Sequence, residues 1–505
     1  MGADAASRPR PSIRHLLPFL AGAVAALGLA PFSLPLLTVA ALAVFFGTLT
    51  LKTVNPRAAA RAGFLFGLGY FLVALHWIVQ PFFVDAARHG WMAPFALAGL
   101  AGGMALFWAA GLWAATKLAG RAGPVSGVLG LGLAEMVRSG FLGGFPWALI
   151  GSVWVDSPAR AAAAWIGVHG LTLLTLGLAA GLAAAVGTRS RAGGALALFC
   201  AAALAGAALI APPPVTPGPD ALRVRVVQAN AAQHLKWRSD MIPVFWERHL
   251  QLTSAPSDRP PDVTIWPEVS MPYLAGTNPE ADGGIAAAAN GATVLVGAQR
   301  RDQGGLFNSL VAIDPDGETA AIYDKHHLVP FGEYFPGGAL AARLGFTGLA
   351  TNALGAFTSG PGPQVLDLTG LGLGRVAPLI CYEAIFPRYG RVALPRADWI
   401  VQVTNDAWFG DFAGPQQHLD LARLRAVEQG LPLVRAANTG ISAVIGPDGH
   451  VLGEIALDTA GYLDVDLPAP LPPTGYARLG PAPVWAVLAV LAALLLMRRR
   501  QALTA

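Results

Sequence analysis

The chain has 505 residues, of which 54% are hydrophobic and only 13% charged, and its net charge is +4. Soluble domains carry about a quarter of their residues as Asp, Glu, Lys or Arg, so this composition excludes an ordinary soluble protein. The Lys and Arg residues gather beside apolar segments, which accounts for the small positive excess, and no nucleic-acid partner is implied.

Eight segments are nearly free of charge, and a helix of about 20 apolar residues crosses the hydrocarbon core of a bilayer. We predict that each of them spans a membrane, seven before residue 212 and one near the C-terminus: 13–30, 33–51, 62–83, 91–116, 123–138, 161–187, 193–211 and 484–497. Segment 123–138 is the least apolar because it holds Glu135 and Arg138. Their i,i+3 spacing on a helix favours a structural ion pair.

The basic residues predict the orientation of these spans, because short cytoplasmic loops carry the excess of Lys and Arg. Basic clusters precede the first span and follow the second, fourth, sixth and eighth: Arg8, Arg10 and Arg14; Lys52, Arg57 and Arg61; Lys117 and Arg121; Arg189 and Arg191; Arg498, Arg499 and Arg500. All lie on one side if both termini are cytoplasmic, which places 212–483 on the other side. A cleaved signal peptide at the N-terminus would break this alternation. The abundance of Ala, Gly and Arg indicates a bacterium, so we expect the inner membrane, with 212–483 in the periplasm.

The segment between the last two spans has the pattern of an α/β domain. A Pro-rich stretch at 211–219 leads out of the membrane, and Asp314-Pro315-Asp316-Gly317 predicts a hairpin turn. The expected strands are 222–228, 262–266, 293–298, 308–313, 320–323, 374–380, 399–404, 433–437 and 442–445, with one more after the turn at 446–449. The expected helices are 240–254, 278–289, 384–393 and 416–429. Strands alternating with helices predict a layered α/β fold.

The predicted domains are therefore three. A membrane domain of seven transmembrane helices occupies 1–211, an α/β domain occupies 212–480, and a C-terminal transmembrane helix with a basic cytoplasmic tail occupies 481–505.

Three polar residues stand at or just past the ends of expected strands, where reactive groups gather in α/β sheets. Cys381 ends 374–380, Glu268 follows 262–266, and Lys325 follows the hairpin. Cys200 lies in the seventh span, so it cannot pair with Cys381. Each residue has a plainer interpretation: Cys381 as a small buried hydrophobe, Glu268 as a turn cap and Lys325 as a surface lysine. Together, an acid, a base and a nucleophile predict a reaction centre.

Four motifs in order carry a family resemblance: Trp266-Pro267-Glu268, the stretch from Asp324 to Tyr334 that ends in Pro-Phe-Gly-Glu-Tyr, Ile380-Cys381-Tyr382-Glu383, and Thr404-Asn405-Asp406-Ala407-Trp408-Phe409. They resemble the signature of the nitrilase superfamily. With seven spans before that domain and one after it, the chain resembles the apolipoprotein N-acyltransferase family over essentially its whole length.

This resemblance implies a four-layer α-β-β-α nitrilase-like sandwich beside the membrane helices, and a ping-pong acyl transfer. The acyl donor is a phospholipid, and the acceptor is the α-amine of the diacylglyceryl-cysteine of an apolipoprotein. By motif, Cys381 is the nucleophile, Glu268 the general base and Lys325 the electrostatic partner. The resemblance also implies substrate-binding or supporting roles for Trp237, Glu333, Tyr382, Glu383 and Asn405. It implies none for the pair His326-His327.

The chemistry explains these residue types. A free thiol is only a few per cent thiolate at neutral pH, so Glu268 has to take its proton. The cation of Lys325 stabilises the thiolate and the oxyanion, with the backbone N–H of Tyr382 as a second donor. No cofactor or metal is required, and adjacent histidines on a strand point in opposite directions.

Three questions stay open at this level. Phe335, Leu340 and Phe346, in and beside the Gly-rich stretch 337–362, form either an apolar loop that enters the membrane or an ordinary surface loop. A membrane-tethered carbon–nitrogen hydrolase would use the same three catalytic residues with water as acceptor. A non-catalytic lipid-binding membrane protein, such as a transporter, would show polar residues at mid-membrane, whereas these spans are mostly Ala, Leu and Gly.

Overall fold

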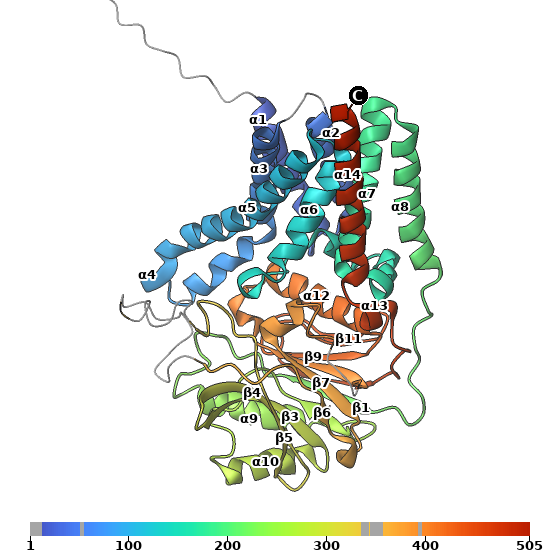
Figure 1. Ribbon diagram of the computed structural model, residues 1–505. Coiled ribbons are helices and arrows are strands. Elements are labelled where there is room, and N and C mark those ends of the chain that lie inside the picture. The colour runs from blue at the N-terminus through green and yellow to red at the C-terminus, as the bar shows by residue number, and fades with distance from the viewer. Residues whose placement is uncertain (1–12, 51–54, 335–342, 344–356, 392–395, 505) are drawn as a thin grey trace, which may run out of the picture.

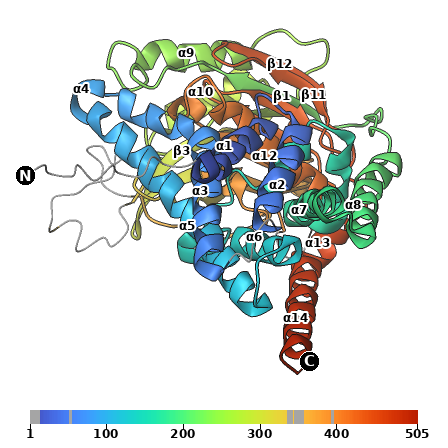
Figure 2. The same cartoon turned by 90° about the horizontal axis from the view of Figure 1, so that it is seen from above.

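The computed structural model describes residues 13–50, 55–334, 343, 357–391 and 396–504. A bundle of helices lies against a pair of β-sheets (Figure 1). The bundle comprises α1 (Ile13–Ala25), α2 (Pro35–Thr50), α3 (Pro56–Ala74), α4 (Ala86–His89), α5 (Ala93–Ala119), α6 (Pro124–Arg138), α7 (Ala163–Thr188), α8 (Arg191–Leu209) and α14 (Ala482–Thr504). Seen from above, the helices overlie part of the sheets, with β1, β11 and β12 visible beside them and α4 and α14 at the rim (Figure 2).

All eight apolar segments are helical, but not all are long enough to be assigned as spans. Four helical stretches have the length and apolarity to cross a membrane: Ala86–Ala119, Pro158–Thr188, Arg191–Leu209 and Ala482–Ala502. A fifth is added if Pro56–Ala74 and His76–Phe83, which meet at a 47° bend, form one broken span. Leu16–Gly28 and Pro35–Thr50 are apolar but shorter, and α6 has only 15 residues. Among the described residues, length and composition thus support four or five spans.

Small residues let the helices of the bundle approach closely, as is common where lipid gives no hydrophobic drive. A Cβ on Gly22 of α1 would stand 1.9 Å from Phe66 O of α3, and one on Gly111 of α5 would stand 2.2 Å from Gly130 O of α6. A larger residue at either position would push the helices apart.

Two six-stranded sheets follow the membrane helices, in the orders β12-β1-β2-β3-β4-β5 and β11-β10-β9-β8-β7-β6. The strands of the first are β1 (Arg223–Gln228), β2 (Val263–Ile265), β3 (Thr293–Asp302), β4 (Gly305–Ile313), β5 (Thr319–Asp324) and β12 (Gly461–Asp466). Those of the second are β6 (Leu366–Asp367), β7 (Arg375–Ile380), β8 (Trp399–Thr404), β9 (Leu433–Ala437), β10 (Ser442–Ile445) and β11 (Val451–Ile455). Both sheets are mixed, with parallel β1-β2-β3 and β7-β8-β9 at their centres.

Apolar side chains from both sheets meet in one core, to which Val226 and Ile265 contribute from the first sheet and Val401 and Val434 from the second. A second cluster joins the first sheet to α9 (Ile242–Thr253) and α10 (Pro279–Ala289). A third joins the second sheet to α12 (Gly414–Gln429). The short helix α13 (Gly475–Leu479) leads into α14.

The predicted helix 384–393 is wrong. Residues Cys381–Ile385 form a short 3-10 helix, η8, and the chain then turns. The reason is local, since the residue before a proline is disfavoured in helical conformation. Phe386, which precedes Pro387, is extended with φ −91° and ψ 114°. Strands β6 and β12 were not predicted. Residues Phe335, Leu340 and Phe346 of the proposed apolar loop lie outside the described residues.

A fully buried ion pair organises the inner end of the bundle. The expected contact between Glu135 and Arg138 exists, with Arg138 Nε 2.7 Å from Glu135 Oε1. Arg138 also donates to three main-chain carbonyls of the segment that follows α6, those of Phe145, Trp147 and Ala148, at 2.7–3.0 Å. The carboxylate of Glu135 accepts from Trp108 Nε1 at 2.8 Å. The pair therefore fixes the 141–149 segment, which faces the sheets.

Replacing Arg138 should destabilise the protein strongly. Arg138→Met would leave the Glu135 carboxylate buried without its cation and three carbonyls without their donor, a loss of about 3–5 kcal/mol in the free energy of unfolding. Thermal unfolding in detergent should show a clearly lower midpoint. Arg57→Met, at an exposed position in the first turn of α3, should leave the midpoint unchanged. Equal midpoints for both variants would contradict a structural role for the pair.

Candidate active site

The three predicted catalytic residues come from both sheets and converge. Glu268 lies three residues after β2, Lys325 directly follows β5, and Cys381 directly follows β7. All are buried, with 7%, 1% and 6% of their surface exposed. Lys325 Nζ lies 3.5 Å from Glu268 Oε1, and the charges of Glu268 and Lys325 both act on the Cys381 thiol.

Lys325 is held between two carboxylates. Its Nζ donates to Glu333 Oε1 at 2.9 Å, a shorter contact than that to Glu268. Burial disfavours the charged ammonium, but Glu333 and Glu268 outweigh it and hold the pKa of Lys325 above its ordinary value. Lys325 is thus a fixed cation at any physiological pH.

Neutral and main-chain donors complete the coordination of the two carboxylates. Asn308 Nδ2 donates to Glu268 Oε1 at 2.7 Å and to Glu333 Oε1 at 3.1 Å. The backbone N–H of Asn405 donates to Glu268 Oε2 at 2.9 Å, and that of Val329 donates to Glu333 Oε2 at 2.7 Å. These contacts aim Glu268 toward the space shared with Lys325 and Cys381. Asn308 was not predicted, because nothing around it in the sequence sets it apart.

Cys381 occupies a strained turn at the start of η8. Its φ is +50°, a conformation that costs an L-residue about 1 kcal/mol or more and recurs at functional sites. Burial and the Glu268 carboxylate raise the pKa of the Cys381 thiol above its ordinary value, and they outweigh Lys325 and a hydrogen bond from Thr404, which lower it. The side chain of Cys381 is therefore a neutral thiol at rest.

Behind the nucleophile lies a buried polar cluster that was not predicted. The main-chain carbonyl of Cys381 is 3.2 Å from His418 Nε2 on α12 and 3.5 Å from Gln402 Nε2 on β8. His418 Nδ1 lies 2.9 Å from Asp406 Oδ1, and Asp406 also pairs with Arg435. The cluster anchors the backbone of Cys381 from the second sheet.

Glu383 connects the nucleophile turn to the lysine segment. Its buried carboxylate accepts from the N–H of Ile380 at 2.8 Å and from that of His326 at 2.9 Å. It also accepts from the Tyr323 hydroxyl at 3.0 Å and contacts His326 Nδ1 at 2.6 Å. Burial raises the pKa of Glu383, but these contacts outweigh it and keep that pKa below its ordinary value. Glu383 thus links the segment that follows β5 to the turn that holds Cys381, and His326 lies against its carboxylate.

The remaining predicted residues lie at different depths. Asn405 is inside the site, where its amide bonds to Gln233 at 2.8 Å. Trp237 is 42% exposed. The centroid of its ring lies 5.5 Å from Nζ of Lys236, the residue before it in the chain. His327 stacks on the Tyr382 ring at 5.5 Å, so its side chain belongs to the aromatic wall beside the nucleophile.

The 141–149 segment, which follows α6 of the helical bundle, forms one wall of this region. The Tyr382 hydroxyl donates to Gly144 O at 3.3 Å, and the rings of Phe145 and Tyr382 lie 6.4 Å apart. The Trp147 ring lies 5.3 Å from that of His418. The segment that follows α6 is thus in direct contact with the residue next to Cys381 and with His418.

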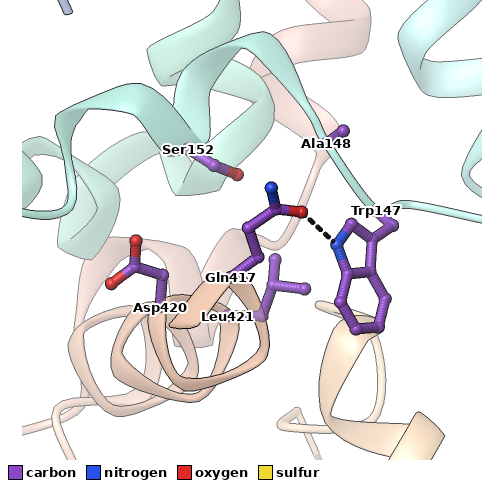
Figure 3. A pocket seen from close by; sticks show the side chains of 6 residues that line it. All are labelled: Trp147, Ala148, Ser152, Gln417, Asp420 and Leu421. Carbon is purple, nitrogen blue, oxygen red and sulfur yellow. Dashed lines mark hydrogen bonds between the residues drawn. The ribbon is translucent and has the colours of Figure 1, made fainter. Parts of the chain in front are cut away.

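A small cavity separates that wall from α12 (Figure 3). Its volume is about 10 Å³, and it is lined by Trp147, Ala148, Ser152, Gln417, Asp420 and Leu421. Trp147 Nε1 donates to Gln417 Oε1 across it at 2.8 Å. A single water needs roughly this much space, so the cavity is too small for a lipid. Within the described part of the chain, no group of three or more His, Cys, Asp or Glu side chains could hold a metal ion.

Comparison with known proteins identifies the family. The model of the carbon–nitrogen hydrolase family matches residues 223–471, and that of the apolipoprotein N-acyltransferase N-terminal domain matches residues 21–181. An apolipoprotein N-acyltransferase from Rhodopseudomonas palustris is 37% identical over 96% of this chain and 95% of its own. The chain belongs to the apolipoprotein N-acyltransferase family.

Two further similar proteins are a second family member and a solved structure. The apolipoprotein N-acyltransferase from Caulobacter vibrioides is 38% identical over 94% of this chain and 92% of its own. An amidase structure from Nesterenkonia sp. is 22% identical over 54% of this chain and 97% of its own, with a TM-score of 0.36. Membership of the acyltransferase family and the apolar helices identify a membrane protein with a nitrilase-like domain.

The raised pKa of the thiol can be measured directly. In a Cys200→Ala background only Cys381 remains to be alkylated, and only thiolate reacts. Because an ordinary thiol is largely ionised by about pH 9, alkylation of Cys381 by iodoacetamide should still accelerate above that pH. Mass spectrometry of the intact protein gives the rate at each pH. A plateau below about pH 8 would indicate a preformed thiolate and would contradict this assignment.

Proposed function

We propose that this protein transfers a fatty acyl chain from a phospholipid to the α-amine of the diacylglyceryl-cysteine of an apolipoprotein, through a thioester on Cys381. The observation that carries the proposal is the convergence of Glu268, Lys325 and Cys381 in a buried site walled by the membrane half. This is where a lipid substrate has to meet a nucleophile.

In the first half-reaction, Glu268 accepts the thiol proton as Cys381 Sγ attacks the ester carbonyl carbon of the phospholipid. The electron pair of the carbonyl moves to its oxygen, and this oxyanion is stabilised by Lys325 and by the backbone N–H of Tyr382. The carbon–oxygen bond of the ester then breaks. Glu268 returns its proton to the leaving alkoxide, and a lysophospholipid departs.

In the second half-reaction, the amine of the apolipoprotein attacks the thioester carbon. Glu268 takes a proton from the amine, the same two donors hold the oxyanion, and the carbon–sulfur bond breaks. The thiolate recovers the proton from Glu268. Glu268 therefore accepts one proton and donates one proton in each half-reaction. It ends each half-reaction in the state in which it began. The supporting residues Trp237, Glu333, Tyr382, Glu383 and Asn405 bind substrate or position these groups.

We also propose the architecture that serves this reaction. The packing of α9 and α10 on one sheet and α12 on the other supports a four-layer α-β-β-α sandwich at 212–480. The eight apolar helices are proposed as spans, α14 included, in a membrane domain at 1–211 and an anchor at 481–505. Arg499 donates to Lys117 O at 2.8 Å, which places two basic clusters at one end of the bundle. This favours cytoplasmic termini and a periplasmic catalytic domain.

A membrane-tethered hydrolase would use the same residues with water as acceptor. The direct contact of Tyr382 with Gly144 and Phe145 weighs against it, because a segment that only anchors the domain to the membrane would not have to pack beside the nucleophile. A lipid-binding protein without catalysis would need neither a strained cysteine nor a buried cation.

Acyl transfer predicts a covalent intermediate. After incubation with phospholipid, the intact mass of the protein should rise by one fatty acyl group, located on Cys381. Cys381→Ala should show no adduct and no transfer, since a thiol is lost with little change in volume. Cys381→Ser should be at least 100-fold slower, because its hydroxyl is much harder to deprotonate than a thiol. An adduct on Cys381→Ala would contradict the assignment, and an adduct that water releases without any amine would favour the hydrolase.

The proposed orientation can be tested with single cysteines in a Cys200→Ala background, where Cys381 is buried. Gln303→Cys lies in the exposed turn after β3, and Gln501→Cys lies near the end of α14. An impermeant thiol reagent on intact spheroplasts should label the first, and it should label the second only after the membrane is broken. The reverse pattern would overturn the orientation. Labelling of both would put residues 303 and 501 on the same side of the membrane, and α14, the proposed span that lies between them, would then be excluded as a span.

A further inference from the structure

A second buried lysine lies beside the base. Lys236 belongs to the segment between β1 and α9 and is only 8% exposed. Its Nζ donates to the main-chain oxygen of Glu268 at 3.2 Å and lies 5.5 Å from the ring centroid of Trp237. None of the chemical steps above uses this cation.

The main-chain oxygen that Lys236 holds belongs to a tight turn. Val269 has φ +48°, and the N–H of Ser270 donates to Gly297 O at 2.7 Å. A Cβ on Gly297 would stand 2.3 Å from Pro267 O and 2.6 Å from Glu268 Cα, so β3 lies directly against this turn. The geometry leaves Glu268 little freedom, and the charge-assisted hydrogen bond from Lys236 adds a further contact to its backbone.

The two charges also interact through space. Burial lowers the pKa of Lys236 to about 8, while the Glu268 carboxylate raises it, so the side chain is mostly a cation at neutral pH. His249 of α9 also lies within reach of this charge, which adds to the effect of burial in holding the pKa of His249 near 4. The histidine is therefore neutral and does not compete. Lys325 faces the same carboxylate from the first sheet.

We propose that Lys236 is a positioning residue for Glu268: it fixes the main chain of the base and places a second positive charge beside its carboxylate. This inference rests on the proposed role of Glu268 as the base. Lys325 contacts the carboxylate and is proposed to stabilise the reacting carbonyl, whereas Lys236 contacts the main chain of Glu268. The base is thus held between two cations of different function.

The test is the pH profile of thioester formation in a single turnover, measured by intact mass on the full-length protein with phospholipid. Lys236→Met keeps the apolar stem and removes the charge. Its rate at the optimum should fall about tenfold, and the acid limb of its profile should move to higher pH by roughly one unit, the size expected when a nearby opposite charge is lost. Lys236→Arg should slow the reaction while leaving the acid limb in place.

Control variants distinguish a failure of the Lys236 proposal from a failure of the proposed role of Glu268. Arg238→Met removes an exposed cation of the same segment, paired with Asp240, and should change neither rate nor profile. If Lys236→Met does not accumulate in the membrane, Lys236→Gln supplies a neutral donor that should show the same displaced acid limb. A slower Lys236→Met with an unmoved acid limb would reduce Lys236 to a structural residue and overturn the proposal, as would an unchanged rate. Normal thioester formation by Glu268→Gln would instead overturn the role of the base itself.

Discussion

A buried ammonium cannot remain charged without partners, since removing it from water costs several kcal/mol. Lys325 is 1% exposed, and it remains charged because Glu268 and Glu333 lie 3.5 and 2.9 Å from its Nζ. Each carboxylate in turn needs donors, which Asn308 and two main-chain N–H groups supply. The ends of β2 and β5 and the middle of β4 are therefore fixed relative to one another by the requirement to bury three charges together.

The nucleophile comes from the other sheet, so the two sheets have to be aligned at this point. Glu383 does this, because one carboxylate accepts from Ile380 at the end of β7 and from His326 just after β5. The helical bundle adds a further set of contacts to the backbone of Cys381. Arg138 holds the carbonyl of Trp147, whose ring lies against His418, and His418 lies 3.2 Å from the carbonyl of Cys381. A disturbance among the membrane helices can thus reach the nucleophile through three contacts.

The sequence was informative where the relevant pattern is local. Apolar runs predicted the helices α1, α2, α3, α5, α6, α7, α8 and α14, the turn at 314–317 predicted the β4-β5 hairpin, and i,i+3 spacing predicted the pair Glu135–Arg138. The three proposed catalytic residues were singled out because each of them stands at or near a strand end. The span count did not follow so directly, since length and apolarity alone support four or five. His418 was missed because its partner Cys381 is 37 residues away, and Asn308 because its neighbours in sequence are an ordinary strand. Contacts between distant segments depend on how the sheets pack, and no periodicity predicts that.

The raised pKa of the Cys381 thiol has a consequence for a protein whose catalytic domain is proposed to face the periplasm. Thiolates are the species that oxidants and disulfides attack, and Cys381 has no cysteine partner, since Cys200 lies in α8. A cysteine kept ionised by Lys325 alone would be exposed to this chemistry between turnovers. Burial and the negative charge of Glu268 keep it as a thiol instead. In the proposed mechanism, the thiolate forms only when a carbonyl carbon is present to receive its electron pair, because only then does the transfer of its proton to Glu268 lead to a bond. In that mechanism, the carboxylate that keeps the resting thiol weakly nucleophilic is also the group that activates it in the complex with substrate.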